Sequence, residues 1–248
     1  KMAVKVAING FGRIGRLAFM ATKQNEIQGN ERMENVEEAL GKTELWVENN
    51  QRVLWIILGI VIVIALAIFG LTKRNQMRNE AASSAIFKAQ NYFESEQYEN
   101  ALNGDGNNLG FLDIIDEYGS TKTGKLASYY AGISYMKTGK YQEAIDYLKK
   151  FDGKDEILAP MALGAIGDCY MELDDMSNAV SYYKQAAGMN ANEFTSPMFL
   201  QKAGMTYEIM GDDAKALETY KTLQKDFPLS NEAFDITKKI AYLEAKMK

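Results

Sequence analysis

The 248-residue sequence contains no histidine, one cysteine and three prolines. Without histidine the chain lacks the commonest general base and metal ligand, and the nucleophile pairs that depend on histidine. The single cysteine, Cys169, cannot form an internal disulfide or a multi-cysteine zinc site, and it does not reveal the redox compartment. So few prolines suit a mostly helical chain, because proline breaks helix interiors. We therefore expect an all-α protein that is not an enzyme and carries no cofactor or metal.

Positive charge is scarce in the second part of the chain. From Asn79 to the C-terminus there are 17 Lys/Arg and 26 Asp/Glu, a difference of −9. Nucleic-acid binders need clustered positive charge. We therefore expect no nucleic-acid partner.

The N-terminal segment, residues 1–19, differs from the rest. A short β-branched stretch, Val4 to Ile8, runs into a G-x-G-x-x-G fingerprint, whose glycines let a backbone approach a pyrophosphate. The string resembles the extreme N-terminus of glyceraldehyde-3-phosphate dehydrogenases. The match consists of the three glycines and three further residues: Gly10, Gly12, Gly15, Asn9, Arg13 and Arg16.

The resemblance to dehydrogenases ends at Met20. No second apolar strand follows, and no carboxylate stands where the fingerprint needs one to hold a ribose. Cys169 lies in "GDCYME", not in that family's catalytic string. We interpret the fingerprint as non-functional and residues 1–19 as a fused leader or remnant, to be excluded from fold reasoning.

A long apolar run separates an acidic arm, residues 20–52, from the rest. Val53 to Leu71 contains no charged side chain, and its 19 residues span roughly 28 Å as a helix, close to a bilayer's hydrocarbon thickness. Trp46 and Trp55 near its start suit an interfacial aromatic belt. A buried core helix rarely lacks a polar face over five turns, and no cleavage site follows the run as in a signal peptide. We predict one transmembrane helix over residues 53–71, in contact with the lipid bilayer.

The charges that flank this run bear on its orientation. Lys42 and Arg52 precede it, whereas Lys73, Arg74, Arg78 and Lys88 follow it. The positive-inside rule would place the following domain in the cytoplasm.

Three stretches of the second half repeat. In each, a glycine is followed by a tyrosine three residues later and an alanine nine residues after that, which is the tetratricopeptide pattern of two helices and a tight turn. The sets are Gly132/Tyr135/Ala144, Gly167/Tyr170/Ala179 and Gly204/Tyr207/Ala216. The small residues suit the close approach of two helices, and each tyrosine is expected to pack against the next repeat. Gly139 and Gly211 suit the turns between helices.

An irregular first repeat precedes these three, with Ala89, Tyr92, Tyr98 and Ala101 in the matching places. An insert after it predicts a short helix from Phe111 to Tyr118. A last helix from Asn231 to Lys246 is expected to cap the stack. The predicted fold is a helical solenoid of about four tetratricopeptide repeats over residues 79–248, preceded by one transmembrane helix.

The layout as a whole resembles the YfgM-like proteins of Gram-negative bacteria. The acidic arm, the single span, an alanine-rich first helix, "ALNGDG" and "GFLDIIDEY" carry this resemblance over about residues 20–248. It implies a single-pass inner-membrane protein whose repeats face the periplasm, against the positive-inside count. It also implies an accessory or chaperone role at the Sec translocon, beside a membrane-anchored prolyl isomerase. The alternative is a scaffold for another cell-envelope complex.

The first helix of each tetratricopeptide repeat lines a concave groove, which is the candidate binding site. Positions around the repeat glycines give the groove candidates: Ile133, Met136, Lys137, Met161, Asp168, Met171, Glu172, Met198, Gln201, Met205 and Glu208. Five are methionines, which are flexible and suit surfaces that accept varied apolar segments. Methionine also fills gaps in cores, so packing against a neighbouring repeat stays an alternative. The three acidic side chains would favour basic segments of unfolded clients.

Two acidic pairs resemble metal ligands at first sight. Asp174-Asp175 and Asp212-Asp213 both fall at expected turns between helices. Aspartate there caps the following helix. We therefore expect caps at these positions, not a metal site.

Overall fold

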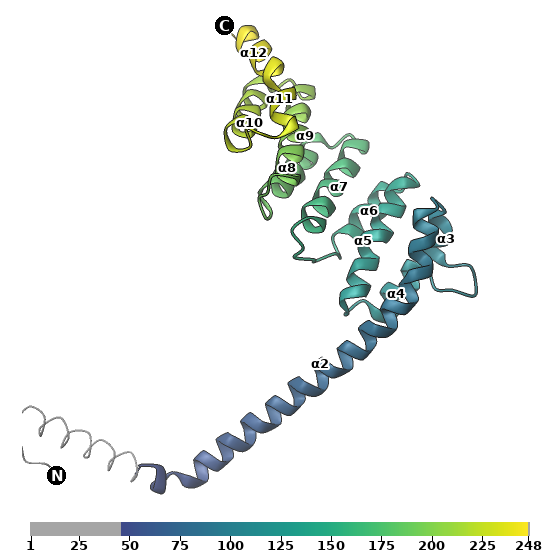
Figure 1. The fold of residues 1–248 in the computed structure, drawn as a ribbon, viewed down its shortest axis with the longest axis vertical. Coiled ribbons are helices and arrows are strands. Elements are labelled where there is room, and N and C mark those ends of the chain that lie inside the picture. Colours follow the sequence, from purple (N-terminus) through teal and green to yellow (C-terminus); the bar gives the residue numbers. More distant parts are fainter. Residues whose placement is uncertain (1–45, 248) are drawn as a thin grey trace, which may run out of the picture. The chain divides into compact units, whose positions relative to one another are not determined.

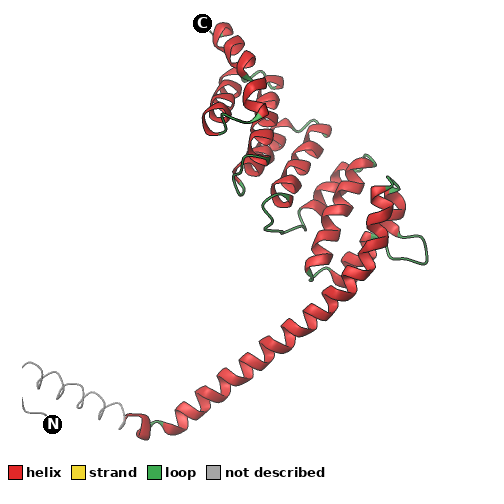
Figure 2. Ribbon diagram, in the orientation of Figure 1, coloured by secondary structure: helices red, strands yellow, loops and turns green. Residues whose placement is uncertain are grey.

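The computed structural model describes residues 46–247, and every regular element within them is a helix (Figure 2). The chain divides into two units, residues 1–70 and residues 71–248. The predicted leader, with its fingerprint glycines Gly10, Gly12 and Gly15, lies outside the described residues. So does most of the acidic arm.

Helix α2, Gln51–Glu94, contains the predicted membrane span and continues without a break into the first repeat (Figure 1). Its apolar part is long enough to cross a bilayer, and no residue of that window is buried; Trp55 and Phe69 are 70% and 68% exposed. Further along, Ala82, Ile86 and Ala89 are buried. Their spacing of four and three residues places them on one face of the helix. The first part of α2 is thus apolar and exposed on all sides, whereas its last part buries residues on one face only.

The unit from Leu71 onward is a stack of helix pairs. In each regular repeat a first helix packs on a second helix, which then packs on the first helix of the next repeat. The three regular pairs are α5 (Lys122–Lys137) with α6 (Tyr141–Leu148), α7 (Leu158–Glu172) with α8 (Met176–Gly188), and α9 (Thr195–Ile209) with α10 (Asp213–Asp226). This arrangement confirms the predicted tetratricopeptide solenoid (Figure 1).

The two ends of the stack are irregular. The end of α2 shares a core with the short helix α3 (Tyr98–Asn103), and the insert forms α4 (Phe111–Tyr118) at the predicted residues. Phe111 and Ile114 of α4 are fully buried in the core that α2, α3 and α5 share. The predicted last helix is divided at Ile236 into α11 (Asn231–Asp235) and α12 (Thr237–Lys246). The helical part of the insert therefore contributes to the first core, whereas residues 105–109 before it form an exposed loop.

The repeat glycines lie where two helices approach closely. A Cβ at Gly167 would overlap the ring of Tyr183, and one at Gly204 would overlap the ring of Tyr220. Both tyrosines are buried on the second helix of the same repeat. A side chain at either glycine would push the two helices apart, which explains why the small residue recurs.

Each turn between a first and a second helix contains one residue in the left-handed conformation. Four such residues follow the repeat glycine, or Ala89, by seven positions: Glu96, Gly139, Asp174 and Gly211, with φ of 58°, 76°, 59° and 75°. Glycine adopts this conformation without strain, whereas a residue with a Cβ does so at a cost of about 1 kcal/mol. The predicted turn roles of Gly139 and Gly211 are confirmed, and the other two turns carry strain.

We expect Asp174→Gly to stabilise the protein by about 0.5–1 kcal/mol, because glycine relieves the left-handed strain and the exposed Asp174 side chain caps no helix. Gly139→Ala should have the opposite effect, at about 1 kcal/mol. Thermal unfolding of the full chain in detergent, followed by circular dichroism, measures both. A lower midpoint for Asp174→Gly would contradict this account of the turn.

Candidate functional site

The eleven predicted groove residues all lie on the first helices α5, α7 and α9, but they differ in exposure. Lys137, Glu172 and Met205 are exposed. The remaining eight are half-buried: Ile133, Met136, Met161, Asp168, Met171, Met198, Gln201 and Glu208. Most of the predicted site residues are therefore only partly accessible to a binding partner.

Four of the five predicted methionines pack against cores. Met136 lies against the core between α6 and α7, and three others lie against the core of α8 and α9: Met161, Met171 and Met198. The Thr206 hydroxyl also donates to the sulfur of Met171 over 3.6 Å. Met205 is 44% exposed and belongs to none of these cores. Of the five, Met205 is the methionine whose position fits surface binding best.

Asp168 joins two repeats. Its carboxylate accepts a hydrogen bond of 2.7 Å from the Tyr183 hydroxyl of α8 and bonds of 2.7 and 2.8 Å from Lys202 Nζ of α9. The Lys202 ammonium also lies 5.6 Å from the centre of the Tyr183 ring. A carboxylate, a tyrosine and a lysine from three successive helices thus form one polar link.

Glu208 forms the same kind of link one repeat later. It accepts hydrogen bonds from the Tyr220 hydroxyl of α10 and, over 2.8 Å, from Lys239 Nζ of α12. Asp168 follows its repeat glycine by one residue and Glu208 by four, so two different positions provide the same contact. Both carboxylates are paired with a lysine, which leaves Glu172 as the predicted groove acid that forms no ion pair among residues 46–247.

Burial sets the chemistry of the groups beside these links. It raises the pKa of Tyr183, and the hydrogen bond to Asp168 raises that pKa further. Burial also raises the pKa of the Cys169 thiol to about 12, with Asp168 as the second cause. Since the reactive form of cysteine is the thiolate, the buried Cys169 is a packing residue.

Sequence reasoning missed the residues that fill the space beneath the repeat glycines. Leu148, Tyr183 and Tyr220 each follow their glycine by 16 residues, and that constant spacing is a signal present in the sequence. The repeat tyrosines lie against cores that include the next repeat, as predicted, and they also stack within their own repeat. Tyr135 stacks on Tyr147 with ring centres 5.2 Å apart, and Tyr170 stacks on Tyr182 at 5.4 Å. Each partner lies on the second helix of the same repeat.

Ile209 is a second residue that the prediction omitted. It follows the repeat glycine by five positions, as Lys137 and Glu172 do in their repeats, and it is 60% exposed. It lies one helical turn after Met205 on α9, so the two apolar side chains share a face. Together they form the exposed apolar part of the candidate groove.

Three surface pockets lie along the second helices. One of about 260 Å³ is lined by Lys184, Tyr207 and Thr219 among others, and one of about 480 Å³ shares Lys184 and Tyr207 with it. A third, of about 430 Å³, includes Phe151 and Tyr182. None of these three pockets is lined by a predicted groove residue. They do not extend the candidate site.

One aspartate of each acidic pair caps a helix as expected, whereas Asp174 lies in the turn and Asp213 is the first residue of α10. Asp175 Oδ1 accepts from the backbone N–H of Asn178 at the start of α8, and Asp212 Oδ1 accepts from that of Lys215 at the start of α10. Within residues 46–247, no group of three or more Cys, Asp or Glu side chains could hold a metal ion.

The polar link at Asp168 gives a stability prediction. Asp168→Ala should destabilise the chain by about 1–2 kcal/mol, because the buried Tyr183 hydroxyl loses its charged acceptor. Lys202→Met should cost less, about 0.5 kcal/mol, since the Lys202 and Asp168 side chains are each 37% exposed and solvent screens the ion pair. Denaturant unfolding of the full chain in detergent measures both variants. Equal losses would show that the lysine, and not the tyrosine, is the important partner.

Comparisons with known proteins agree with this architecture. Models of the tetratricopeptide repeat match residues 162–193 and residues 126–153 and 200–230. No curated protein was found to match the chain.

Among solved structures, the crystal structure of MamA is 23% identical, covers 55% of this chain and 90% of its own, and has a TM-score of 0.38. A putative kinesin light chain of Podosopora anserina with nearly identical TPR-like repeats is 12% identical, covers 68% and 98%, and has a TM-score of 0.47. These similarities say nothing about the partners of this chain. The described chain is an all-α solenoid that contains tetratricopeptide repeats, and such repeats are modules for protein–protein interaction.

Proposed function

We propose that the chain is a protein-binding module tethered to a bacterial inner membrane by residues 53–71, with its repeats in the periplasm. In this role it is an accessory or chaperone factor at the Sec translocon. Its partners are translocon subunits, a membrane-anchored prolyl isomerase or unfolded clients.

The observation that carries the proposal is the two-part character of α2. Its apolar part has no buried residue, and its last part enters the core of the first repeat. An exposed apolar run of that length needs a non-aqueous surrounding. The translocon, the periplasmic side and the prolyl isomerase rest on the resemblance to YfgM-like proteins described above.

The proposed contact surface is the series of first helices. Its exposed members are Lys137, Glu172, Met205 and Ile209. Among the half-buried members of the predicted set, four methionines pack against the cores. A mixed surface of methionine, isoleucine and single charges suits weak binding of varied extended segments better than recognition of one shape.

The second function is a scaffold for another cell-envelope complex. The same exposed surface and the same anchor would serve it, so the identity of the bound proteins distinguishes the two functions.

Crosslinking in the native membrane, followed by purification of the chain, tests the proposed role. We expect translocon subunits among the crosslinked proteins. Met205→Ser combined with Ile209→Ser should reduce their recovery about tenfold or more, because two exposed apolar side chains can each contribute roughly 1 kcal/mol at an interface. Recovery of other envelope proteins in place of translocon subunits would favour the scaffold.

The matched control changes two exposed apolar residues outside the first helices. Leu173 and Leu229 are 43% and 85% exposed and lie in turns. Leu173→Ser with Leu229→Ser should leave recovery unchanged. An equal loss in both double variants would point to a general effect of surface polarity and contradict the proposed surface.

A second prediction concerns the side of the membrane. Cys169 is buried, with a pKa raised to about 12, so the chain gives little background with a maleimide. A cysteine introduced at the exposed Lys184 should react with an impermeant maleimide on intact spheroplasts. One at the exposed Glu48 should react only after lysis. The reverse pattern would place the repeats in the cytoplasm, as the flanking charges suggest.

A further inference from the structure

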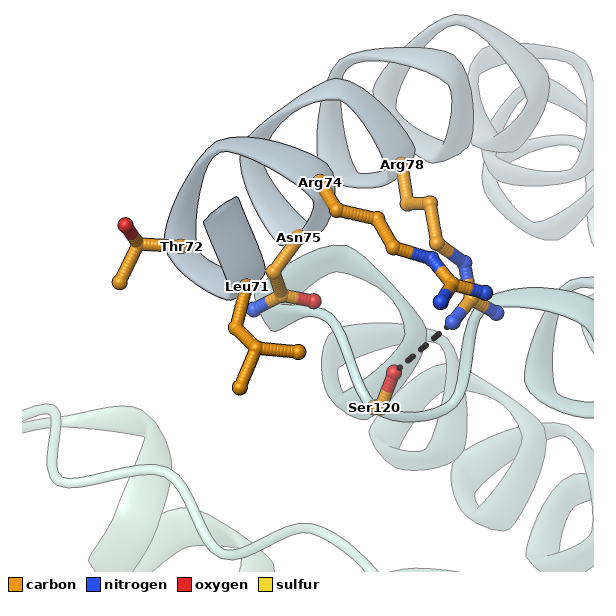
Figure 3. A pocket seen from close by; sticks show the side chains of 6 residues that line it. All are labelled: Leu71, Thr72, Arg74, Asn75, Arg78 and Ser120. Carbon is orange, nitrogen blue, oxygen red and sulfur yellow. Dashed lines mark hydrogen bonds between the residues drawn. The ribbon is translucent and has the colours of Figure 1, made fainter. Parts of the chain in front are cut away.

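A basic pocket lies at the beginning of the repeat unit, apart from the candidate groove. Its volume is about 480 Å³, and Figure 3 shows the six residues that line it. They are Leu71, Thr72, Arg74, Asn75, Arg78 and Ser120. Five belong to one stretch of α2, and Ser120 comes from the turn between α4 and α5.

Two arginines dominate this pocket. Arg74 and Arg78 are one helical turn apart on α2, and both side chains extend toward the turn that contains Ser120 (Figure 3). Like charges at this spacing repel each other. Arg78 donates to the carbonyl oxygen of Glu117 and to Ser120 Oγ over 3.5 Å. Within residues 46–247, neither arginine forms an ion pair.

The surrounding acids do not compensate this charge. Glu117 offers Arg78 its backbone carbonyl, while hydrogen bonding to its carboxylate raises the pKa of Tyr118. Glu80 accepts a hydrogen bond of 3.1 Å from Gln76. Two guanidinium groups and a hydroxyl therefore converge without a partner anion, which is an arrangement that an added phosphate would stabilise.

The position of the pocket along α2 indicates where such an anion would come from. Leu71 is the last residue of the apolar run, and Arg74 and Arg78 follow it by three and seven residues. At 1.5 Å per residue these positions are roughly 4.5 and 10 Å farther along the helix. The headgroup layer extends roughly 5–8 Å beyond the hydrocarbon core. Long arginine side chains at these positions reach the level of the lipid phosphates.

We propose that this pocket binds the phosphate of an anionic membrane lipid, with Arg74 and Arg78 donating to its oxygens and the Ser120 hydroxyl beside them. This inference rests on the membrane anchor of the proposed function. It does not depend on which side of the membrane the repeats face, or on which proteins they bind. Lipid binding would also explain why Arg74 and Arg78 follow the span without reference to the orientation of the span in the membrane. This explanation would remove the conflict between the positive-inside count and a periplasmic domain.

Native mass spectrometry of the full chain in detergent, with added phosphatidylglycerol or phosphatidylcholine, tests the proposal. We expect selective retention of phosphatidylglycerol. Arg74→Gln with Arg78→Gln should reduce that retention roughly tenfold or more, since each basic residue at a membrane surface contributes a several-fold gain. The control, Lys184→Gln with Lys238→Gln, removes the same charge from two exposed lysines elsewhere and should change nothing. Equal retention by both double variants would overturn the proposal.

Two further variants separate binding from folding and charge from geometry. Arg74 has no hydrogen bond to a described residue, so Arg74→Gln alone should weaken lipid retention without lowering the unfolding midpoint. Arg74→Lys with Arg78→Lys keeps the charge but loses the planar fork, and should fall between the wild type and the glutamine variant. Unchanged retention in Arg74→Gln would overturn the role of Arg74.

Competition distinguishes a lipid from a free ion. Inorganic phosphate at millimolar concentration should not displace phosphatidylglycerol; displacement with full loss of lipid selectivity would overturn the lipid assignment. A carbonate wash of native membranes tests the anchor separately. Release of both wild type and variant would show that the anchor has failed, whereas a retained chain without lipid selectivity would show that the pocket has failed.

Discussion

The close approach of the two helices in each repeat is the constraint on which the solenoid depends. Gly167 and Gly204 leave room for the rings of Tyr183 and Tyr220, and a Cβ at either glycine would overlap those rings. The buried tyrosine then fills the space beneath the glycine and presents its hydroxyl to the first helix. Backbone spacing, core filling and the polar link between repeats therefore follow from one pair of residues.

The tyrosine hydroxyls connect this packing to the stack. A buried hydroxyl needs a hydrogen-bond partner, and here the partner is a carboxylate that a lysine of the next repeat, or of the terminal helix α12, neutralises. Asp168 and Glu208 therefore have a structural role, because their carboxylates already bind a tyrosine hydroxyl and a lysine. The exposed surface left for a protein partner consists of side chains without such links, among them Met205 and Ile209.

Helix α2 has two parts with different surfaces. Its apolar run has no polar face and no buried residue, while Ala82, Ile86 and Ala89 show the one-sided pattern of a helix that packs on a core. The arginines follow the apolar run directly and carry charge that no described carboxylate balances. A candidate membrane span, two arginines and the first helix of the repeat stack thus follow one another along a single helix.

The helical repeats, the turns at Gly139 and Gly211, the helix from Phe111 to Tyr118 and the capping aspartates could be predicted, because each depends on local spacing and backbone preference. The apolar run could be recognised because its length and composition can be read along the chain without any tertiary contact. The division of the last helix at Ile236 could not, because no proline or glycine marks it.

For the candidate site, the sequence placed the residues on the first helices but could not rank them. Whether Met171 is a surface or a core residue, and whether Asp168 is free or paired with Lys202, depends on side chains 34 or 35 residues away. The sequence by itself determined the repeat and the turn positions, since these arise from periodicity within one helix pair, and it located the apolar run by composition alone. Only the tertiary structure decided which side chains remain available to a partner, because that depends on the contacts between successive pairs.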